Sequence, residues 1–213
     1  MKKNPLIELL SRLEIIKEDD LYVYHHGTRD NLDIEILRCK STGMILLDKC
    51  FTHEEYYESN LNYTNEKKGQ VLFKGNEKRI INPLDDDLRR FNDYQSIISR
   101  KRLLDFGCGK GKFLKKCNQI ASVTGIELNE KNRFDLNEES IECYEALGEI
   151  PDKIKFDVIT LNHVLEHLED PVKELREIRN YMKQESILII EVPHAMDILL
   201  ETFDLESFKK FTF

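Results

Sequence analysis

The chain has 213 residues, of which 40% are hydrophobic, and its formal net charge at pH 7 is −8. These values predict one main domain with a sizeable core and a small accessory piece. The acidic balance without a long basic tract argues against a nucleic-acid partner, and apolar stretches no longer than a strand argue against a membrane partner.

The start of the chain predicts a short amphipathic helix over residues 5–18 instead of a secretion signal, because apolar and charged residues alternate there. The apolar residues at helical spacing are Leu6, Leu9, Leu10, Leu13 and Ile16. We therefore expect a cytoplasmic protein. Its five cysteines are an odd number without the spacing of a disulfide framework, so we expect reduced thiols.

Residues 1–82 are predicted to combine this helix with a small accessory and lid region. Strand-like runs separated by turn residues over 21–48 indicate an antiparallel unit. A tyrosine-rich segment follows, and we expect it to be either a lid over a binding site or a surface loop. Residues 64–82 are polar and predict a linker or a hairpin.

Residues 83–213 are predicted to form an α/β domain with a Rossmann-like, doubly wound, mostly parallel sheet. A helix follows Pro83 and begins with three aspartates, and Asp170 before Pro171 marks another helix start. The predicted strands are 102–106, 122–127, 140–144, 155–161 and 187–192, and the predicted helices between them are 112–119 and 171–182.

A glycine-rich turn follows the first of these strands, in the sequence LLDFGCGKG over residues 103–111. Glycines at alternate positions let backbone N–H groups approach a nucleotide-like ligand closely. Lys112 stands where a dinucleotide fingerprint requires a small residue, which argues against a nicotinamide cofactor. Glu127 ends the next strand, where a carboxylate can accept both hydroxyls of a ribose.

Together with FDVITLNHVLEHLEDP at 156–171 and ILIIEVP at 187–193, these motifs resemble the class I S-adenosylmethionine-dependent methyltransferases over about residues 100–195. The resemblance implies S-adenosylmethionine as cofactor, with the glycine loop at its methionine end, Glu127 on the ribose and residues 143–146 beside the adenine. The implied cofactor contacts are Asp105, Gly107, Cys108, Gly109, Gly111, Glu127, Leu128, Glu145, Ala146 and Asn162. The family's sheet has two further strands, the last antiparallel, so we expect these C-terminal strands to be missing.

The segment that begins at Cys39 resembles the degenerate zinc-ribbon front end of methyltransferases that act on sugars and secondary metabolites. Thr42 stands at the second ligand position of the usual CxxC pair, so a four-sulfur zinc site cannot form. We expect a metal-free remnant of the ribbon, with a mixed site as the alternative. The mixed site would use His25, His26, Cys39 and Cys50.

Histidines near the ends of the last two strands are the candidates for chemistry. His163 or His194 is predicted to be the general base that deprotonates the methyl acceptor. A lower-ranking alternative is a divalent metal on His163, Glu166 and His167, which would share one face of a helical turn. Glu166 and His167 also have a purely structural interpretation, in which they tie the strand-to-helix turn to the backbone.

The expected function is methyl transfer to a small polar metabolite, by in-line displacement with a histidine base. The front-end resemblance favours a nucleotide-sugar or phosphorylated precursor of a bacterial capsule or surface polysaccharide. Lys110, Lys112, Arg89 and Arg90 are candidate cations for such an acceptor. The alternatives are a metal-assisted O-methyltransferase and a non-catalytic cofactor-binding subunit, and a homodimer stays open.

Overall fold

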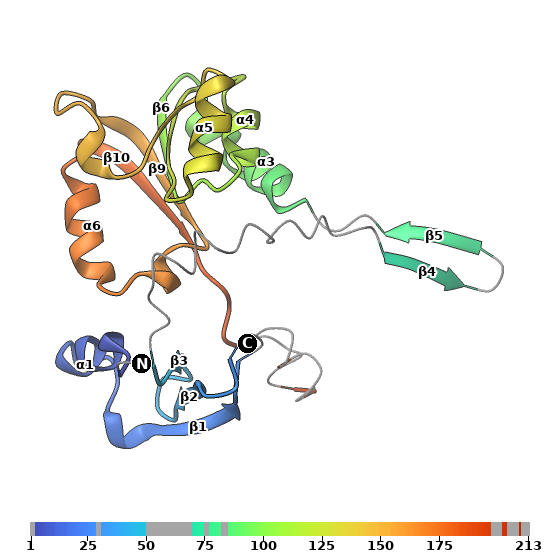
Figure 1. Cartoon of the computed structure of the whole chain (residues 1–213), viewed down its shortest axis with the longest axis vertical. Coiled ribbons are helices and arrows are strands. Elements are labelled where there is room, and N and C mark those ends of the chain that lie inside the picture. The colour runs from blue at the N-terminus through green and yellow to red at the C-terminus, as the bar shows by residue number, and fades with distance from the viewer. Residues whose placement is uncertain are drawn as a thin grey trace. The chain divides into compact units, whose positions relative to one another are not determined.

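The computed structural model describes residues 3–28, 31–49, 85–196, 202–203 and 209, together with the backbone alone of 70–74 and 77–81. The chain divides into two compact units (Figure 1). The first comprises Met1–Thr52, Glu166–Glu174 and Val192–Phe213, and the second comprises His53–Leu165 and Leu175–Glu191. The predicted domain boundary between residues 82 and 83 lies outside the described residues and stays a prediction.

The first unit contains a short helix and an antiparallel sheet. Helix α1 (Pro5–Arg12) follows Asn4, whose side chain accepts the backbone N–H of Leu6 at 3.0 Å. After α1 come the 3-10 turn η1 (Glu18–Asp20) and the strands β1 (Leu21–His26), β2 (Glu35–Cys39) and β3 (Ile45–Leu47). The three strands pair antiparallel in the order β1-β2-β3. The antiparallel unit predicted from the sequence is therefore confirmed.

The predicted N-terminal helix is too long, because α1 ends at Arg12 and not at residue 18. Glu14 has a φ of 58°, a left-handed conformation that a right-handed helix cannot continue through. Leu13 is 46% exposed, whereas Ile7 and Ile16 are buried in one cluster with Cys39. Ile7 therefore belongs to the core of this unit, although it is not one of the apolar residues that the helical spacing predicted.

The segment predicted to be a linker or a hairpin contains a hairpin. Strands β4 (Gln70–Lys74) and β5 (Glu77–Ile81) pair antiparallel. The tyrosine-rich segment (Tyr56, Tyr57, Tyr63) and the proposed metal ligand Cys50 lie outside the described residues.

The second unit carries a parallel sheet in the order β10-β9-β6-β7-β8. Its strands are β6 (Arg102–Phe106), β7 (Ser122–Ile126), β8 (Glu142–Tyr144), β9 (Phe156–Asn162) and β10 (Met182–Glu191). The helices beside them are α3 (Asp86–Ile98), α4 (Lys112–Cys117), α5 (Glu130–Glu138) and α6 (Pro171–Arg179), with 3-10 turns η2 (Leu147–Glu149) and η3 (Leu165–His167). This order and direction confirm the Rossmann-like α/β fold.

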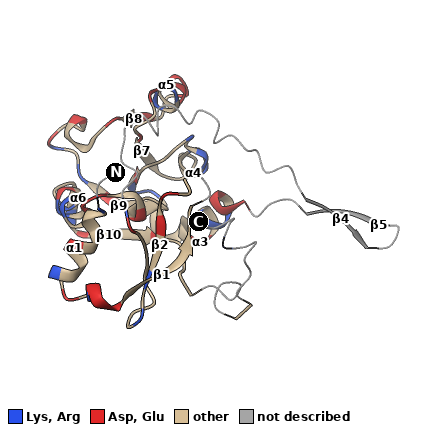
Figure 2. Ribbon diagram, turned by 60° about the horizontal axis from the view of Figure 1, so that its bottom comes forward, with Lys and Arg blue, Asp and Glu red and all other residues tan. Residues whose placement is uncertain are grey.

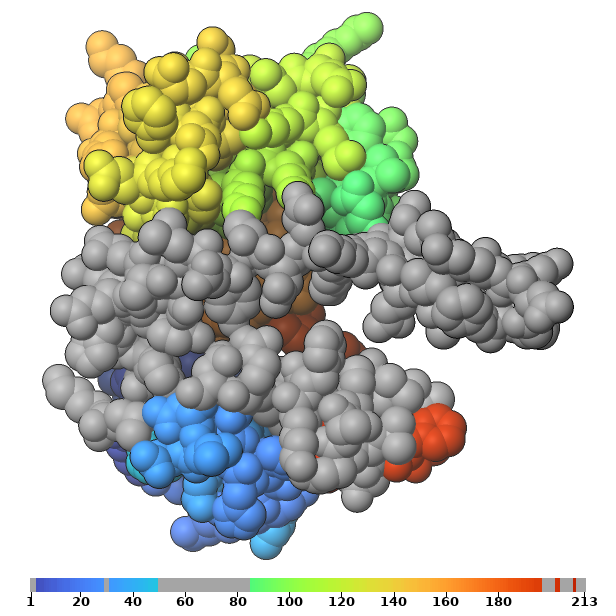
Figure 3. Space-filling model, turned by 45° about the vertical axis from the view of Figure 1, so that its right-hand side comes forward, coloured from blue at the N-terminus to red at the C-terminus, as the bar shows by residue number. Residues whose placement is uncertain are grey.

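Successive side chains on each central strand enter opposite cores, as a sheet covered on both faces requires. On β6, Leu103 and Leu104 are both fully buried, one in each cluster. The first cluster joins the sheet to α3, α4 and α5, which Figures 1 and 3 show side by side, and the second joins it to Ile178 of α6. The helices after β6 and β7 therefore cover one face, and the helix after β9 covers the other.

In this unit, the predictions and the structure differ by more than two residues at three places. Helix α5 was not predicted, because most of its residues are polar and Leu136 is its only buried residue. The predicted helix 171–182 ends at Arg179, and β10 begins at Met182 and not at residue 187, with a register irregularity between Met182 and Ile187. Asp170 does cap α6, since its carboxylate accepts the backbone N–H of Lys173 at 3.0 Å.

Charged residues of both signs mix along α6, whereas the charged residues of α4 are all lysines. Figure 2 shows Lys and Arg beside Asp and Glu along α6. In the described part of the chain, the helices are too short or too polar to cross a membrane.

Candidate functional site

The topology itself points to one edge of the sheet. The connections from β6 lead to one face and those from β9 lead to the other, so the chain reverses its winding direction between these two neighbouring strands. In doubly wound folds, ligands bind in the crevice outside the carboxyl ends of the strands at this reversal point. Most of the residues predicted as cofactor contacts lie at or directly after the carboxyl ends of β6, β7 and β9 at this edge.

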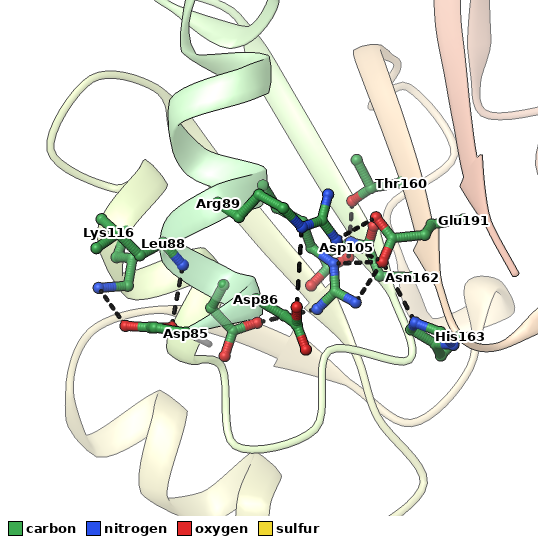
Figure 4. A network of polar contacts seen from close by, with 12 residues as sticks. Asp85, Asp86, Leu88, Arg89, Asp105, Lys116, Thr160, Asn162, His163 and Glu191 are labelled. Carbon is green, nitrogen blue, oxygen red and sulfur yellow. Dashed lines mark hydrogen bonds and ion pairs between the residues drawn. The ribbon is translucent and has the colours of Figure 1, made fainter. Parts of the chain in front are cut away.

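Asp105 near the end of β6 is a buried carboxyl group with two side-chain donors. It accepts the hydroxyl of Thr160 at 2.7 Å and the amide of Asn162 at 3.2 Å (Figure 4). Burial raises the pKa of Asp105 to about 7, and the two hydrogen bonds oppose that rise only in part. The Oδ1 atom of Asn162 is buried without a hydrogen-bond partner among the described residues. A ligand with donor groups, and a cationic one above all, would satisfy both side chains.

The glycine loop turns back onto β7 directly after β6. The N–H groups of Gly107 and Cys108 both donate to the carbonyl of Ile126, at 2.8 and 2.9 Å. Gly107 has a φ of 76°, and a Cβ there would lie 2.5 Å from a methyl group of Val164. At Gly109, by contrast, a Cβ would meet no described atom within 4 Å. The loop is thus tightly packed at Gly107 and open at Gly109, so a ligand can approach the backbone at Gly109.

Glu127 lies beside this loop, as the spacing predicted. Its carboxylate accepts the N–H of Gly109 at 2.7 Å on one oxygen and the N–H of Asn129 at 2.8 Å on the other. Each carboxylate oxygen can accept more than one hydrogen bond, so two ribose hydroxyls could still donate to Glu127. A hydrogen bond therefore joins the glycine loop directly to Glu127, the two parts of the predicted cofactor site.

Leu128, Glu145 and Ala146 form an exposed rim after β7 and β8, whereas the predicted contact Gly111 is buried against Leu136. Leu128 and Glu145 are tied together by Arg133, which donates to the carbonyl of Leu128 and to the carboxylate of Glu145, the latter at 2.6 Å. Arg133 also donates to the carbonyl of Glu127 at 2.8 Å. Ala146 is exposed and precedes η2. Arg133, which contacts Glu127, Leu128 and Glu145, was not predicted from the sequence.

A second group of polar residues gathers around Glu191, the last residue of β10 (Figure 4). Arg89 donates to both carboxylate oxygens at 2.8 and 2.9 Å, and Arg90 donates to one of them at 2.7 and 3.1 Å. Burial alone would raise the pKa of Glu191, but the hydrogen bonds from Arg90 and Arg89 outweigh it and hold the pKa at about 2. Glu191 is therefore ionised at any physiological pH.

His163 belongs to this group. Its Nε2 lies 3.3 Å from a carboxylate oxygen of Glu191, and its backbone N–H donates to the Glu191 carbonyl at 2.8 Å. The residue has a φ of 56°, so it lies in a left-handed turn. His163 therefore does not share a helical face with His167, which follows in the 3-10 turn η3, and the expectation of one common helical turn was wrong.

The other candidate residues lie elsewhere in the chain. His194, Glu166 and His167 belong to the first unit, and the side chain of His194 is exposed. Among the described residues, no group of three or more His, Cys, Asp and Glu side chains is arranged to hold a metal ion. Arg89 and Arg90 are engaged with Glu191, whereas Lys110 and Lys112 are exposed.

Comparison with known proteins decides the family. A family model described as "Methyltransferase domain" matches residues 76–211, more than half of the chain. The chain belongs to this methyltransferase domain family.

Two curated relatives and one solved structure are similar to part of this chain. The methyltransferase domain is 30% identical to a ubiquinone biosynthesis O-methyltransferase of Glaesserella parasuis over 52% of each chain. It is 26% identical to a tRNA U34 carboxymethyltransferase of Campylobacter jejuni, over 49% of this chain and 39% of the relative. A crystal structure of coclaurine N-methyltransferase bound to N-methylheliamine and SAH has 19% identity and a TM-score of 0.45, over 58% of this chain and 40% of that one. The chain thus spans about half the length of the first curated relative and 39% of the length of the second.

Proposed function

We propose that this chain binds S-adenosylmethionine at the carboxyl ends of β6 and β7 and transfers its methyl group to a small polar acceptor. The observation that carries the proposal is the contact between the Gly109 N–H and the Glu127 carboxylate at 2.7 Å. It joins an open glycine turn to a carboxylate at the next strand end, within a chain of the methyltransferase domain family.

The residues present fit the cofactor by their chemistry. Glu127 supplies acceptors for the two ribose hydroxyls, and the open space over Gly109 lets the ligand approach the backbone. Asp105 and the unpartnered Oδ1 of Asn162 supply buried acceptors for an ammonium group. A cation beside Asp105 would favour its ionised form and offset the cost of its burial. When bound, S-adenosylmethionine would supply an activated methyl group on a good leaving group.

The chain's own contribution to the transfer would be positioning and one proton acceptor. Glu191 lies 3.3 Å from Nε2 of His163 and would hold the imidazole in place while the ring takes a proton from the acceptor. Arg89 and Arg90 keep Glu191 charged and in place. His194 is the alternative base.

The acceptor class is proposed from the sequence. The resemblance of the Cys39 segment to the front end of sugar methyltransferases supports a nucleotide-sugar or phosphorylated precursor of a surface polysaccharide, and the acidic net charge argues against nucleic acid. Lys110 and Lys112, which are exposed beside the glycine loop, could contact such an anionic acceptor.

The test is transfer of a labelled methyl group from S-adenosylmethionine into pools of small anionic metabolites and, separately, into tRNA and quinone precursors. We expect label in the anionic pool, and a loss of about 10²-fold or more in His163→Ala but not in His167→Ala. Label in tRNA or quinones only would overturn the proposed acceptor class. Cofactor binding without transfer to any pool would favour a non-catalytic subunit, and unchanged transfer by His163→Ala would remove the proposed base.

A further inference from the structure

Two cysteines from different elements meet beside the glycine loop. Cys108 lies in the loop between Gly107 and Gly109, and Cys143 lies in β8. Their Sγ atoms are 3.8 Å apart, and the described cysteines are all free thiols. The proposed cofactor chemistry uses neither sulfur.

The space in which the two sulfurs meet exists because residue 125 of β7 is glycine. A Cβ at Gly125 would lie 2.7 Å from the Sγ of Cys108 and 3.1 Å from the Sγ of Cys143. Gly125 pairs directly with Cys143 in the sheet. A disulfide requires a sulfur separation of about 2.05 Å, so the two sulfurs need to approach by less than 2 Å. The glycines on both sides of Cys108 give the loop the freedom for a shift of this size.

The pKa values of the two thiols are also shifted in opposite directions. Their mutual hydrogen bond and burial both raise the pKa of Cys108, whereas the hydrogen bond from Cys108 lowers the pKa of Cys143. Cys143 is therefore the thiol whose pKa is shifted toward the thiolate form that oxidation requires. The described Cys117 differs, because burial raises its pKa to about 12.

We propose that Cys108 and Cys143 form an oxidation site that a hydroperoxide converts into a disulfide. In the first step, a thiolate attacks the peroxide, the O–O bond breaks, the sulfur becomes a sulfenic acid, and water or an alcohol leaves. In the second step, the other thiol attacks the sulfenic sulfur, the S–S bond forms, the S–O bond breaks and water leaves. Two thiols and one hydrogen peroxide thus give one disulfide and two waters.

The expected consequence rests on the proposed function. The disulfide would pull Cys108 toward β8 and move the neighbouring Gly109 N–H, which now donates to Glu127. The oxidised chain should therefore bind S-adenosylhomocysteine, a stable stand-in for the cofactor, less tightly than the reduced chain. Reduction by a dithiol should restore the affinity.

Mass spectrometry tests the oxidation site without reference to activity. The reduced full chain is treated with hydrogen peroxide, blocked with N-ethylmaleimide and digested with trypsin without reduction. We expect a disulfide between the peptides 103–110 and 134–153, present in the wild type and in the control Cys117→Ala and lost in Cys108→Ser and Cys143→Ser. Wild-type protein that gives only alkylated thiols or singly oxidised sulfurs, with no linked peptide, would overturn the proposal.

Calorimetry with S-adenosylhomocysteine then separates this inference from the proposed function. We expect at least tenfold weaker binding after oxidation, recovery with dithiothreitol, and no effect of peroxide on Cys143→Ser. Equal affinity of the oxidised and reduced wild type would refute the consequence for the loop. Reduced wild type that binds no ligand would refute the proposed function and leave the disulfide result standing.

Discussion

Two carboxyl groups at the ends of parallel strands in the same sheet have opposite electrostatic environments. Asp105 of β6 is buried among neutral donors and has a pKa of about 7, whereas Glu191 of β10 is surrounded by two arginines and has a pKa of about 2. Only β9 separates these strands. Groups whose environments push their pKa values apart are typical of sites that do chemistry. The Asp105 region can accept a cation, while the Glu191 region is already neutralised and serves to hold His163.

The largest expected effect is on stability, from removal of the Glu191 carboxylate. Glu191→Ala leaves Arg90, whose side chain is only 9% exposed, without its main partner, so we expect a loss of about 3 kcal/mol in the free energy of unfolding. Denaturant unfolding measures it. The matched control is Glu185→Ala, on an exposed residue of the same strand, for which we expect a change within about 0.5 kcal/mol. Equal stability of both variants would show that the arginine cluster contributes nothing.

The glycine loop should show a graded response to added methyl groups. Gly107→Ala places a Cβ 2.5 Å from Val164 at a φ of 76°, so we expect a loss of about 2–3 kcal/mol in stability. Gly109→Ala has no such clash, so we expect a loss of about 1 kcal/mol from backbone strain alone. Thermal unfolding of the two variants measures the difference. Partial rescue of Gly107→Ala by Val164→Ala would confirm the contact, and an equal cost at both glycines would contradict it.

The opposite pKa shifts predict opposite pH dependences of stability. The folded-state pKa of Asp105 is raised from 3.8 to about 7, so its ionisation costs stability as the pH rises through that range, and Asp105→Asn should remove this loss. The pKa of Glu191 is lowered from 4.5 to about 2, so its stabilisation is present above pH 4.5 and is lost as the pH falls toward 2.

Unfolding curves of the wild type, Asp105→Asn and Glu191→Gln, recorded from about pH 2 to about pH 7, measure both pH dependences of stability. A stability difference between wild type and Asp105→Asn that does not change from pH 4 to pH 7 would contradict the described environment of Asp105.

The smallest expected effect is at the start of α3. The carboxylate of Asp85 accepts the N–H of Leu88 at 3.0 Å and caps the helix that carries Arg89 and Arg90. Asp85→Ala should cost about 1 kcal/mol, and Asp85→Asn, which keeps the acceptor, should cost less. Chemical denaturation distinguishes the two. If both substitutions cost the same, the charge of Asp85 near Lys116, and not its cap, would be what matters.

The parts of this molecule that the sequence predicted are those governed by local pattern. The strand 102–106, the glycine loop, the Asp170 cap and the strand end at Glu127 are all visible in short windows. Helix α5 was missed because it buries only Leu136, although Asn129, which accepts the N–H of Asn132, is a recognisable cap.

The cluster around Glu191 could not be predicted in the same way. Its members come from α3, the end of β9 and the end of β10, far apart in the sequence, and only the strand order brings them together. Arg89 and Arg90 were interpreted as cations for an acceptor because the sequence does not reveal their carboxylate partner. The one available signal was Glu191 itself, a charged residue directly after an apolar run.

Calorimetric titration of the reduced chain with S-adenosylhomocysteine tests whether the glycine loop and Glu127 bind the cofactor. We expect one ligand per wild-type chain, at least tenfold weaker binding in Glu127→Ala, and unchanged binding in the control Glu138→Ala on the exposed surface of α5. A wild type that binds no ligand, or a Glu127→Ala variant that binds as tightly as the wild type, would contradict it.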